Sequence, residues 1–476
     1  MIRISLARER MRKTVKRSYK ILPILLVLIL VLISACGQKP TPTPAPPAAI
    51  LTQPPPSLAF TGTPEPTQLP TPTEAPETPT PVPTAELAWK CPAGNVTISI
   101  WHSWPDQGLA TIQSIFDEYR QTCPNVELQL QSRSDLADVT KDELLGDTGP
   151  DIITQLNKDI GRLAESQMII PLDSYIEPDR LTQDYVSVAI SGVSYKDRIY
   201  GYPASMETIT MIYNKDLISE DELPVNTDDL LKKATDWKSA HPEGYFFVYN
   251  TKNDAYFSAP WWQAAGVTIM DDQSNTTFKS DAGYTAGNFI SALRKVMPEE
   301  IDYYVADTLF KEGEAPIIVN GPWYIAELES AGINFGLKTL PVFSPTGIPA
   351  MPLVDIKCLM MTPNAEQRNV AEAAINLMQY YTRAAAQVEL ARANRMVPTH
   401  KSAANAPEVK ALPVVAAFEE QAALGKPIPG SPFIGAMWDP IARGVECIWT
   451  GQSDVNTCVD NIQTLAEENI AGMQGK

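Results

Sequence analysis

Side chains that could carry out catalysis are scarce and scattered in this sequence. It contains no GxSxG, HExxH or GxGxxG motif and no phosphate-cradling loop. The acid pairs Asp271-Asp272 and Glu419-Glu420 are adjacent in sequence, which suits a solvated surface better than glycosidase carboxylates placed across a bond. With only three His and no CxxC pair, a zinc site is not expected. We therefore expect no metal, no cofactor and no enzymatic activity.

Aromatic side chains are the other group with a clear recognition chemistry. The chain has 9 Trp, 17 Tyr and 12 Phe, enough for a sizeable core with aromatic residues left over for a binding site. A pyranose ring has apolar CH faces and a rim of hydroxyls. Aromatic plates therefore suit its faces, and planar polar groups suit its rim.

The charge of the chain excludes two classes of partner. Residues 1–35 carry eight Lys and Arg and one Glu, and the rest has 30 Lys and Arg against 55 Asp and Glu. A body this acidic repels nucleic acid, whose affinity for proteins depends on phosphate neutralisation, and it repels anionic lipid surfaces. We expect a secreted body that binds no nucleic acid.

Strands and helices alternate in the first part of the body, which predicts an α/β fold with parallel sheets. Ligands of such sheets bind beyond the carboxyl ends of the strands, so the stretches after Trp101 and Ile153 should reach a site. The C-terminal third is predicted to be helical. The expected strands are 96–101, 126–131 and one beginning within 149–153, and the expected helices are 110–122, 141–145, 367–387, 409–423, 440–450 and 455–469.

The N-terminus has the pattern of a secretory signal over residues 1–35. A basic segment precedes a short apolar run, and the run ends at Ser34-Ala35-Cys36, which resembles the lipobox of bacterial lipoproteins. Cys36 would then be lipidated; the alternative is a single-pass anchor with an incidental Cys. Residues 36–88 are rich in Pro and Thr and favour an extended, disordered stalk that lifts the body off the membrane.

The cysteines of the body suit an oxidising compartment. Cys91 precedes the first expected strand and Cys123 the second, so neighbouring strand starts would bring them together. Cys447 and Cys458 flank a short helix–loop–helix. We expect the disulfides Cys91–Cys123 and Cys447–Cys458, and we expect Cys358 to be buried and free.

Ordered motifs over residues 95–470 resemble the bacterial extracellular solute-binding proteins of sugar importers, in particular the maltose/maltodextrin-binding proteins. Each motif alone is weak, but their order along the chain is specific. They are Ser99-Ile100-Trp101, Gly149-Pro150-Asp151-Ile152-Ile153, Tyr202-Pro203, Glu207, Ile212-Tyr213-Asn214-Lys215-Asp216-Leu217, Tyr256-Phe257, Asn320-Gly321-Pro322-Trp323, Leu340-Pro341, Thr362-Pro363-Asn364 and Met437-Trp438.

The resemblance implies a periplasmic-binding-protein-like fold over residues 89–476, with two α/β lobes and a ligand cleft between them. One lobe would comprise residues 89–205 and 352–400, the other residues 206–351 and 401–476, and Met206–Tyr213 would cross between them. The protein would be a monomer anchored outside the cytoplasm through the lipid on Cys36. It would close on a carbohydrate and deliver it to the permease subunits of an ABC transporter.

The resemblance also implies the ligand-binding residues. Trp323, Trp438 and Tyr256 fall on aromatic positions that stack on glucose rings, and Glu207 falls on a carboxylate that accepts hydroxyl hydrogen bonds. After Ile153 the sequence departs from the family pattern, which puts maltose itself in doubt. The remaining candidates are Gln155, Lys158 and Asp159 at this departure, Ser103 and Trp104 with His102 and Asp106 after the first strand, and Asn253 or Asp254; Trp261 and Trp262 could line the cleft or pack in the core.

Two other functions stay open at this point. A surface-tethered glycoside hydrolase or lyase would share the carbohydrate ligand. A binding protein for a polyamine, iron or thiamine would share the fold, and the acidic body mildly suits a cation. Ferric carriers generally use paired Tyr ligands, and the aromatic set here suits a sugar ring better.

Overall fold

The computed structural model describes residues 89–104 and 108–475. The described residues belong to one compact unit. The expected signal, Cys36, the stalk and Asp106 lie outside the described residues. No helix within the described ranges is both long and apolar enough to span a membrane.

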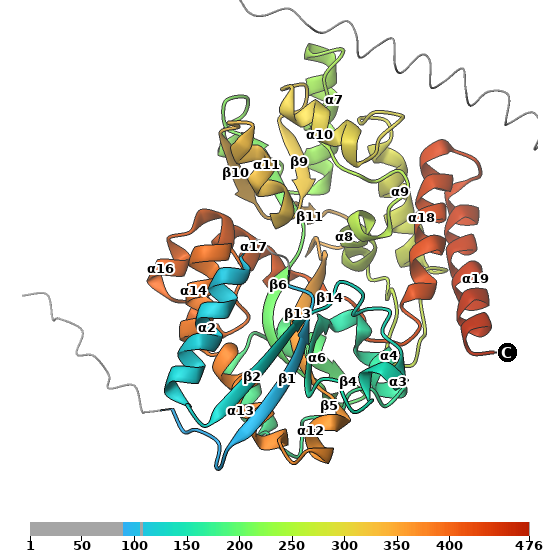
Figure 1. The fold of residues 1–476 in the computed structure, drawn as a ribbon. Helices are drawn as coiled ribbons and strands as arrows, with labels where there is room; N and C mark the ends of the chain where they lie inside the picture. Colours follow the sequence, from blue (N-terminus) through green and yellow to red (C-terminus); the bar gives the residue numbers. More distant parts are fainter. Residues whose placement is uncertain (1–88, 105–107, 476) are drawn as a thin grey trace, which may run out of the picture. The chain divides into compact units, whose positions relative to one another are not determined.

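A larger sheet forms the core of the first lobe (Figure 1). The expected strands β1, β2 and β3 are confirmed, and β1 is parallel to both others. A long strand, β13, which the sequence analysis did not identify, pairs antiparallel with β3 and β6 and parallel with β14. The strands are β1 (Val96–His102), β2 (Val126–Ser132), β3 (Ile152–Leu156), β6 (Gly201–Glu207), β13 (Leu353–Met361) and β14 (Lys426–Pro427).

Helix α2 (Leu109–Thr122) connects β1 to β2 as the alternating pattern predicted. Its apolar positions recur with helical spacing, and Ile112, Ile115, Phe116 and Tyr119 are buried against the sheet. Cys91 and Cys123, which precede β1 and β2, form a disulfide with a Cα–Cα distance of 5.4 Å. The parallel pairing of these strands therefore brings the two cysteines together.

A smaller sheet forms the core of the second lobe, with the order β10-β7-β9-β8. Strand β7 is antiparallel to β10 and β9, and β8 is parallel to β9. The strands are β7 (Thr210–Asn214), β8 (Phe247–Val248), β9 (Ile317–Asn320) and β10 (Phe335–Lys338). Helix α10 (Tyr303–Lys311) packs on β8 and β9.

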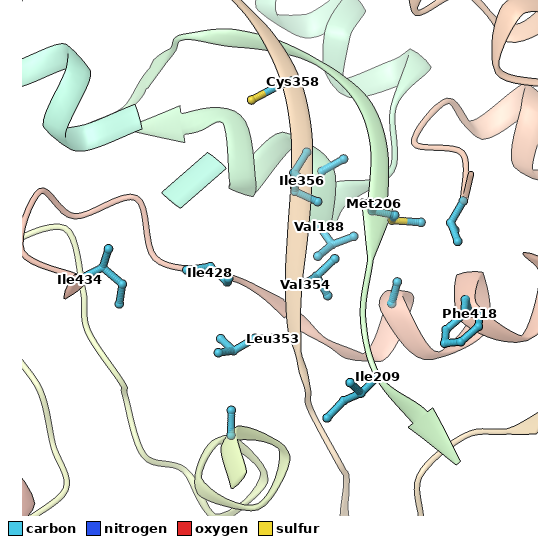
Figure 2. Packing of buried hydrophobic residues seen from close by; sticks show 14 of the residues in the cluster. Val188, Met206, Ile209, Leu353, Val354, Ile356, Cys358, Phe418, Ile428 and Ile434 are labelled. Atoms are coloured by element: carbon cyan, nitrogen blue, oxygen red, sulfur yellow. The ribbon is translucent and has the colours of Figure 1, made fainter. Parts of the chain in front are cut away.

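The chain crosses between the lobes directly after β6, because β6 belongs to the larger sheet and β7 to the smaller one. A second crossing enters β13, and the Thr208 hydroxyl ties the two crossings by donating to the Leu353 carbonyl at 2.8 Å. Figure 2 shows the apolar packing at this point, which draws side chains from both crossings and from more distant segments. Its labelled residues are Val188, Met206, Ile209, Leu353, Val354, Ile356, Cys358, Phe418, Ile428 and Ile434.

The C-terminal helices differ from the expectation in three places, one of which is the expected helix 409–423, divided into α16 (Pro407–Lys410) and α17 (Pro413–Leu424). The expected helix 367–387 is divided into α12 (Pro363–Gln367), α13 (Ala371–Tyr381) and α14 (Ala384–Asn394). Thr382 ends α13 with its hydroxyl hydrogen-bonded to the buried Tyr185 hydroxyl at 2.6 Å, and Arg383 is extended. The periodicity of apolar residues cannot show where the helix ends, because the end depends on this tertiary contact.

Helix α18 (Gly435–Thr450) begins five residues before the expected start and carries Pro440 inside it. Proline cannot donate to the carbonyl four residues earlier, which here belongs to Ala436. The Asn469 side chain donates to that carbonyl instead, at 3.2 Å. Helix α19 (Val455–Met473) is joined to α18 by the Cys447–Cys458 disulfide, with a Cα–Cα distance of 5.7 Å. Cys358 is buried and free.

The stretch 401–427 contacts both lobes, whereas we expected all of 401–476 in the second lobe. Helices α15 (Lys401–Ala404) and α16 (Pro407–Lys410) pack on α14, and β14 joins the larger sheet. Helix α17 (Pro413–Leu424) contacts β6 of the larger sheet and β7 and β10 of the smaller one. A separate small apolar cluster of Ala391, Val409 and Val415 joins α16 and the start of α17 to α14.

The remaining elements connect and cover these sheets. They are α3 (Lys141–Leu144), η1 (Asn157–Asp159), α4 (Ile160–Glu165), α5 (Pro178–Asp184), α6 (Ser187–Val193), β4 (Ser194–Tyr195), β5 (Arg198–Ile199), η2 (Glu220–Glu222), α7 (Thr227–Ala240), α8 (Ala255–Ala265), α9 (Asp281–Leu293), η3 (Pro322–Tyr324), α11 (Ile325–Ser330), β11 (Val342–Phe343) and β12 (Ile348–Pro349).

Candidate ligand-binding cleft

Two adjoining cavities lie near the crossing of the lobes. The interlobe cavity, of about 460 Å³, is lined from the first lobe by Ser205–Glu207, Lys357 and residues 393–397, and from the second lobe by Pro322, Trp323, Ala326 and Glu329. The first-lobe cavity, of about 200 Å³, is lined by residues at the carboxyl ends of β1 and β3. Lys357 and Met396 line both cavities. This is the position where an α/β sheet is expected to bind its ligand.

A larger hollow of about 760 Å³ lies elsewhere, between α6, β14 and the loop after α8. It contains none of the side chains that the sequence predicted for a site. The candidate site is therefore the pair of cavities around Lys357.

Trp323 forms the second-lobe wall of the interlobe cavity. It lies in η3, directly after β9, and its side chain remains 43% exposed. Gly321 makes this position possible, because a Cβ at residue 321 would lie 2.2 Å from the Trp323 ring. The large exposed ring is available to stack on a ligand.

Tyr256 lies beside Trp323, with 6.4 Å between the ring centroids. It belongs to the first turn of α8, which Asp254 caps by accepting a hydrogen bond from the Phe257 amide at 2.8 Å. The Tyr256 hydroxyl donates to the Leu353 carbonyl at 3.4 Å. The structure therefore brings together two of the three predicted aromatic residues.

Trp438, the third predicted aromatic residue, lies in the first turn of α18 and packs partly buried against the core. It lines neither the interlobe nor the first-lobe cavity. Its stacking role stays a prediction.

The floor of the cleft carries charges that the sequence analysis missed. Asp355 and Lys357 alternate with buried residues along β13, and Asp355 is directly opposite Glu207 on β6. The Lys357 ammonium forms an ion pair with the Glu207 carboxylate. The sequence does contain a sign of this arrangement, since the two charged residues stand two positions apart inside an otherwise apolar run. That spacing is the period of a strand with one polar face.

Burial and the nearby Glu207 carboxylate raise the pKa of Asp355 to about 6, although Lys158, Tyr256 and Lys357 favour its charged form. Burial and the Asp355 carboxylate likewise raise the pKa of Tyr256 well above its ordinary value. The two side chains therefore share one partly dehydrated environment beneath the cleft.

Asp355→Asn should stabilise the protein above pH 6 and leave it unchanged near pH 4. Because the folded-state pKa is raised to about 6, the folded chain holds this proton more tightly than the unfolded chain. The free energy of unfolding of the wild type therefore falls as pH rises from about 4 to about 6, by roughly 1 to 3 kcal/mol. Urea denaturation of both proteins at pH 4 and pH 8 measures the difference. Equal free energies of unfolding of the wild type and Asp355→Asn at pH 8 would contradict the raised pKa of the Asp355 carboxyl.

Gln155, Ser103 and Trp104 all line the first-lobe cavity. The Ser103 amide donates to the Thr154 hydroxyl at 3.2 Å, which joins the ends of β1 and β3. Trp104 stacks on His102 with 4.5 Å between ring centroids. His102 is buried rather than exposed to a ligand, and burial lowers its pKa.

The other predicted residues lie in different surroundings. Lys158 is near enough to Asp355 to favour its charged form, whereas Asp159 pairs with Arg162 at 3.4 Å. Asn253 is exposed and lines neither of the two cavities. The open question about the Trp261-Trp262 pair is resolved in favour of packing, since both side chains are almost fully buried in the core.

An ion pair between the two lobes forms part of the lining of the interlobe cavity. Arg395, which ends α14 in a left-handed conformation, contacts Glu329 of α11 at 2.8 Å. Arg395 belongs to the first lobe and Glu329 to the second. Acidic and basic groups thus alternate around the cavity, and they suit hydroxyls that both donate and accept hydrogen bonds.

Two α/β lobes that share crossing strands and enclose a cleft are the architecture of the hinge-closing solute-binding proteins. No group of three or more His, Cys, Asp or Glu within the described residues could hold a metal ion.

A family model described as "Bacterial extracellular solute-binding protein" matches residues 114–417. The chain belongs to this family, which confirms the resemblance seen in the sequence and places the protein outside the cytoplasm.

Named relatives agree with this assignment. The chain is 29% identical over 393 residues to the maltotriose-binding protein of Pyrococcus abyssi, covering 81% of this chain and 84% of that protein. It is 23% identical over 388 residues to a maltooligosaccharide ABC transporter solute-binding lipoprotein of Streptococcus pneumoniae, covering 77% and 87%. Both relatives are named as binding proteins.

A solved structure shows the same fold. It is a cyclo/maltodextrin-binding protein complexed with maltotetraose, with a TM-score of 0.71 and 22% identity over 79% of this chain and 98% of that one. The expected fold class, two α/β lobes of the periplasmic-binding-protein type, is confirmed.

Proposed function

We propose that this protein captures an oligosaccharide outside the cytoplasm and delivers it to the permease subunits of an ABC importer. The observation that carries the proposal is the interlobe cavity, which sets the exposed Trp323 ring against the charged side chains of Glu207 and Lys357. An aromatic face opposite paired hydrogen-bonding groups suits the two chemical surfaces of a pyranose. The names of the relatives favour a glucose-based oligosaccharide.

The protein acts by binding rather than by catalysis in this proposal. The two carboxylates nearest the cleft floor, Glu207 and Asp355, lie on directly paired residues of neighbouring strands. They also share Lys357 as a neighbour. Glycosidase carboxylates instead lie on either side of the bond that they cleave.

We also propose that the mature protein is tethered to the membrane by a lipid on Cys36, with residues 36–88 as a stalk. The signal pattern and the Pro-rich composition support this proposal. Mass spectrometry of the mature N-terminus distinguishes a lipidated Cys36 from an uncleaved anchor.

A thermal-shift screen of the purified protein tests the function. The panel contains maltose, maltotriose, maltotetraose, cello-oligosaccharides, galacto-oligosaccharides and spermidine. A ligand at 100 times its Kd should stabilise the protein by about 2.7 kcal/mol. We expect stabilisation by at least one saccharide, with the sugar recovered intact. Stabilisation by spermidine alone would reject a saccharide ligand, and recovery of shortened sugars would reject a pure binding role.

A further inference from the structure

The Glu207–Lys357 ion pair lies at the junction of the two cavities. Glu207 ends β6, and Lys357 lies on β13, where it is aligned with Ser205 of β6 and Leu156 of β3. Both side chains remain about one-third exposed, at 31% and 35%, so neither is sealed in the core. A structural ion pair would not need this position, because the sheet is already joined by its backbone ladder.

Each partner keeps hydrogen-bonding capacity after the pair has formed. An ammonium carries three donors, and Lys357 uses one of them on Glu207 Oε1. Within the described residues, no other protein acceptor contacts Lys357 Nζ and no protein donor contacts Glu207 Oε2. The pair thus presents a donor and an acceptor side by side to the cleft.

We propose that Glu207 and Lys357 act as one recognition unit for a vicinal diol of a neutral sugar ring, which deepens the proposed oligosaccharide function and rests on it. One hydroxyl donates to Glu207 Oε2, and the adjacent hydroxyl accepts from Lys357 Nζ. The ion pair fixes the spacing of the two groups. A ring that lacks one of these hydroxyls leaves either Glu207 Oε2 or the free N–H donors of Lys357 without a hydrogen bond, and such sites reject the incomplete analogue strongly.

Asp355 is a positioning residue in this unit. Its carboxylate is directly opposite Glu207 in the strand register, and Lys158 and Lys357 both favour its charge. Asp355 therefore repels the Glu207 carboxylate while attracting the Lys357 ammonium. This arrangement limits the positions that both side chains can adopt at the cavity floor.

A double-mutant cycle with Lys357→Met and Glu207→Gln tests the unit, with calorimetric titration of maltotriose or of whichever panel saccharide binds best. Each single change should raise Kd by about 10- to 100-fold, the range for a hydrogen bond to a charged group. The double variant should lose far less than the product of the two single losses, because the residues act together. Lys357→Arg, which keeps a cationic donor, should restore part of the affinity.

Analogues of the same saccharide that lack one hydroxyl of a vicinal pair supply a second readout. The wild type should bind one such analogue much more weakly than it binds the parent sugar. The Lys357→Met variant should bind that same analogue about as tightly as the wild type does. A purely structural role for Lys357 would lower the affinity for all analogues equally.

Lys338→Met is the matched control. Lys338 forms an ion pair with Glu220 at 2.8 Å, on the second-lobe sheet and away from both cavities. The Lys338→Met variant should therefore bind the saccharide with the same Kd as the wild type. If the wild type binds no saccharide, the proposed function fails. The wild type could instead bind a saccharide while the affinity losses of the Lys357 and Glu207 variants multiply in the double variant, or do not occur. The proposed function then holds, and the recognition unit is rejected.

Discussion

Trp323→Ala is expected to raise the Kd for the bound saccharide by roughly 30- to 1,000-fold, which corresponds to about 2 to 4 kcal/mol. The ring is 43% exposed in the structure and forms the second-lobe wall of the interlobe cavity. A sugar that stacks on it would bury an apolar surface that the apo protein leaves in water. Because little of the ring packs in the core, the melting temperature of the apo protein should change little.

Calorimetric titration and thermal unfolding of Trp323→Ala together measure this effect. Tyr304→Ala is a suitable control, because Tyr304 is a second-lobe aromatic residue with 78% exposure that lines neither cavity. It should bind like the wild type. Unchanged affinity in Trp323→Ala would place the binding site elsewhere.

The variant Trp438→Ala distinguishes the stacking role that the sequence resemblance implies for Trp438 from the packing role that the structure indicates. If Trp438 stacks on the ligand, as the resemblance implies, its loss should also abolish tight binding. If it only packs against the core, the apo protein should lose stability instead and bind with nearly normal affinity.

Removal of the Cys91–Cys123 disulfide should destabilise the protein by about 4 kcal/mol, and removal of Cys447–Cys458 by about 3 kcal/mol. The difference follows from loop length, since the bonded residues are 32 and 11 positions apart. The longer loop restricts the unfolded chain more when it is closed. The first disulfide should therefore be the more important for stability.

Denaturant unfolding of the two double Cys→Ser variants tests this order. Cys358→Ser is the control for thiol chemistry, because Cys358 is the free, buried cysteine. Equal stability of the wild type under reducing and oxidising conditions would contradict a contribution from either disulfide.

Local sequence patterns predicted the elements with strong periodicity. Helix α2 buries the apolar positions that recur along 110–122, and strands β1 and β2 form where they were expected. The helix boundaries near Thr382 and Pro440 could not be predicted, because each depends on a distant partner: the Tyr185 hydroxyl in one case and the Asn469 amide in the other.

The residues around the candidate cleft were indicated in part by the sequence. The resemblance indicated Trp323, Tyr256 and Glu207, and the structure brings these three near the lobe crossing. Asn253 was also predicted, but it lies exposed outside both cavities. Its neighbour Asp254 instead caps α8, a role that depends only on local backbone geometry.

The sequence by itself determined the class of protein, through its α/β alternation, its ordered motifs and its acidic, cysteine-containing body. Only the tertiary structure revealed the charged floor of the cleft. Glu207 and Lys357 are 150 positions apart, and they meet because β6 and β13 pair antiparallel, with Asp355 opposite Glu207 and Lys357 opposite Ser205. A slip of one residue would turn Lys357 to the other face of the sheet. That pairing joins segments far apart in the chain, which no local pattern records.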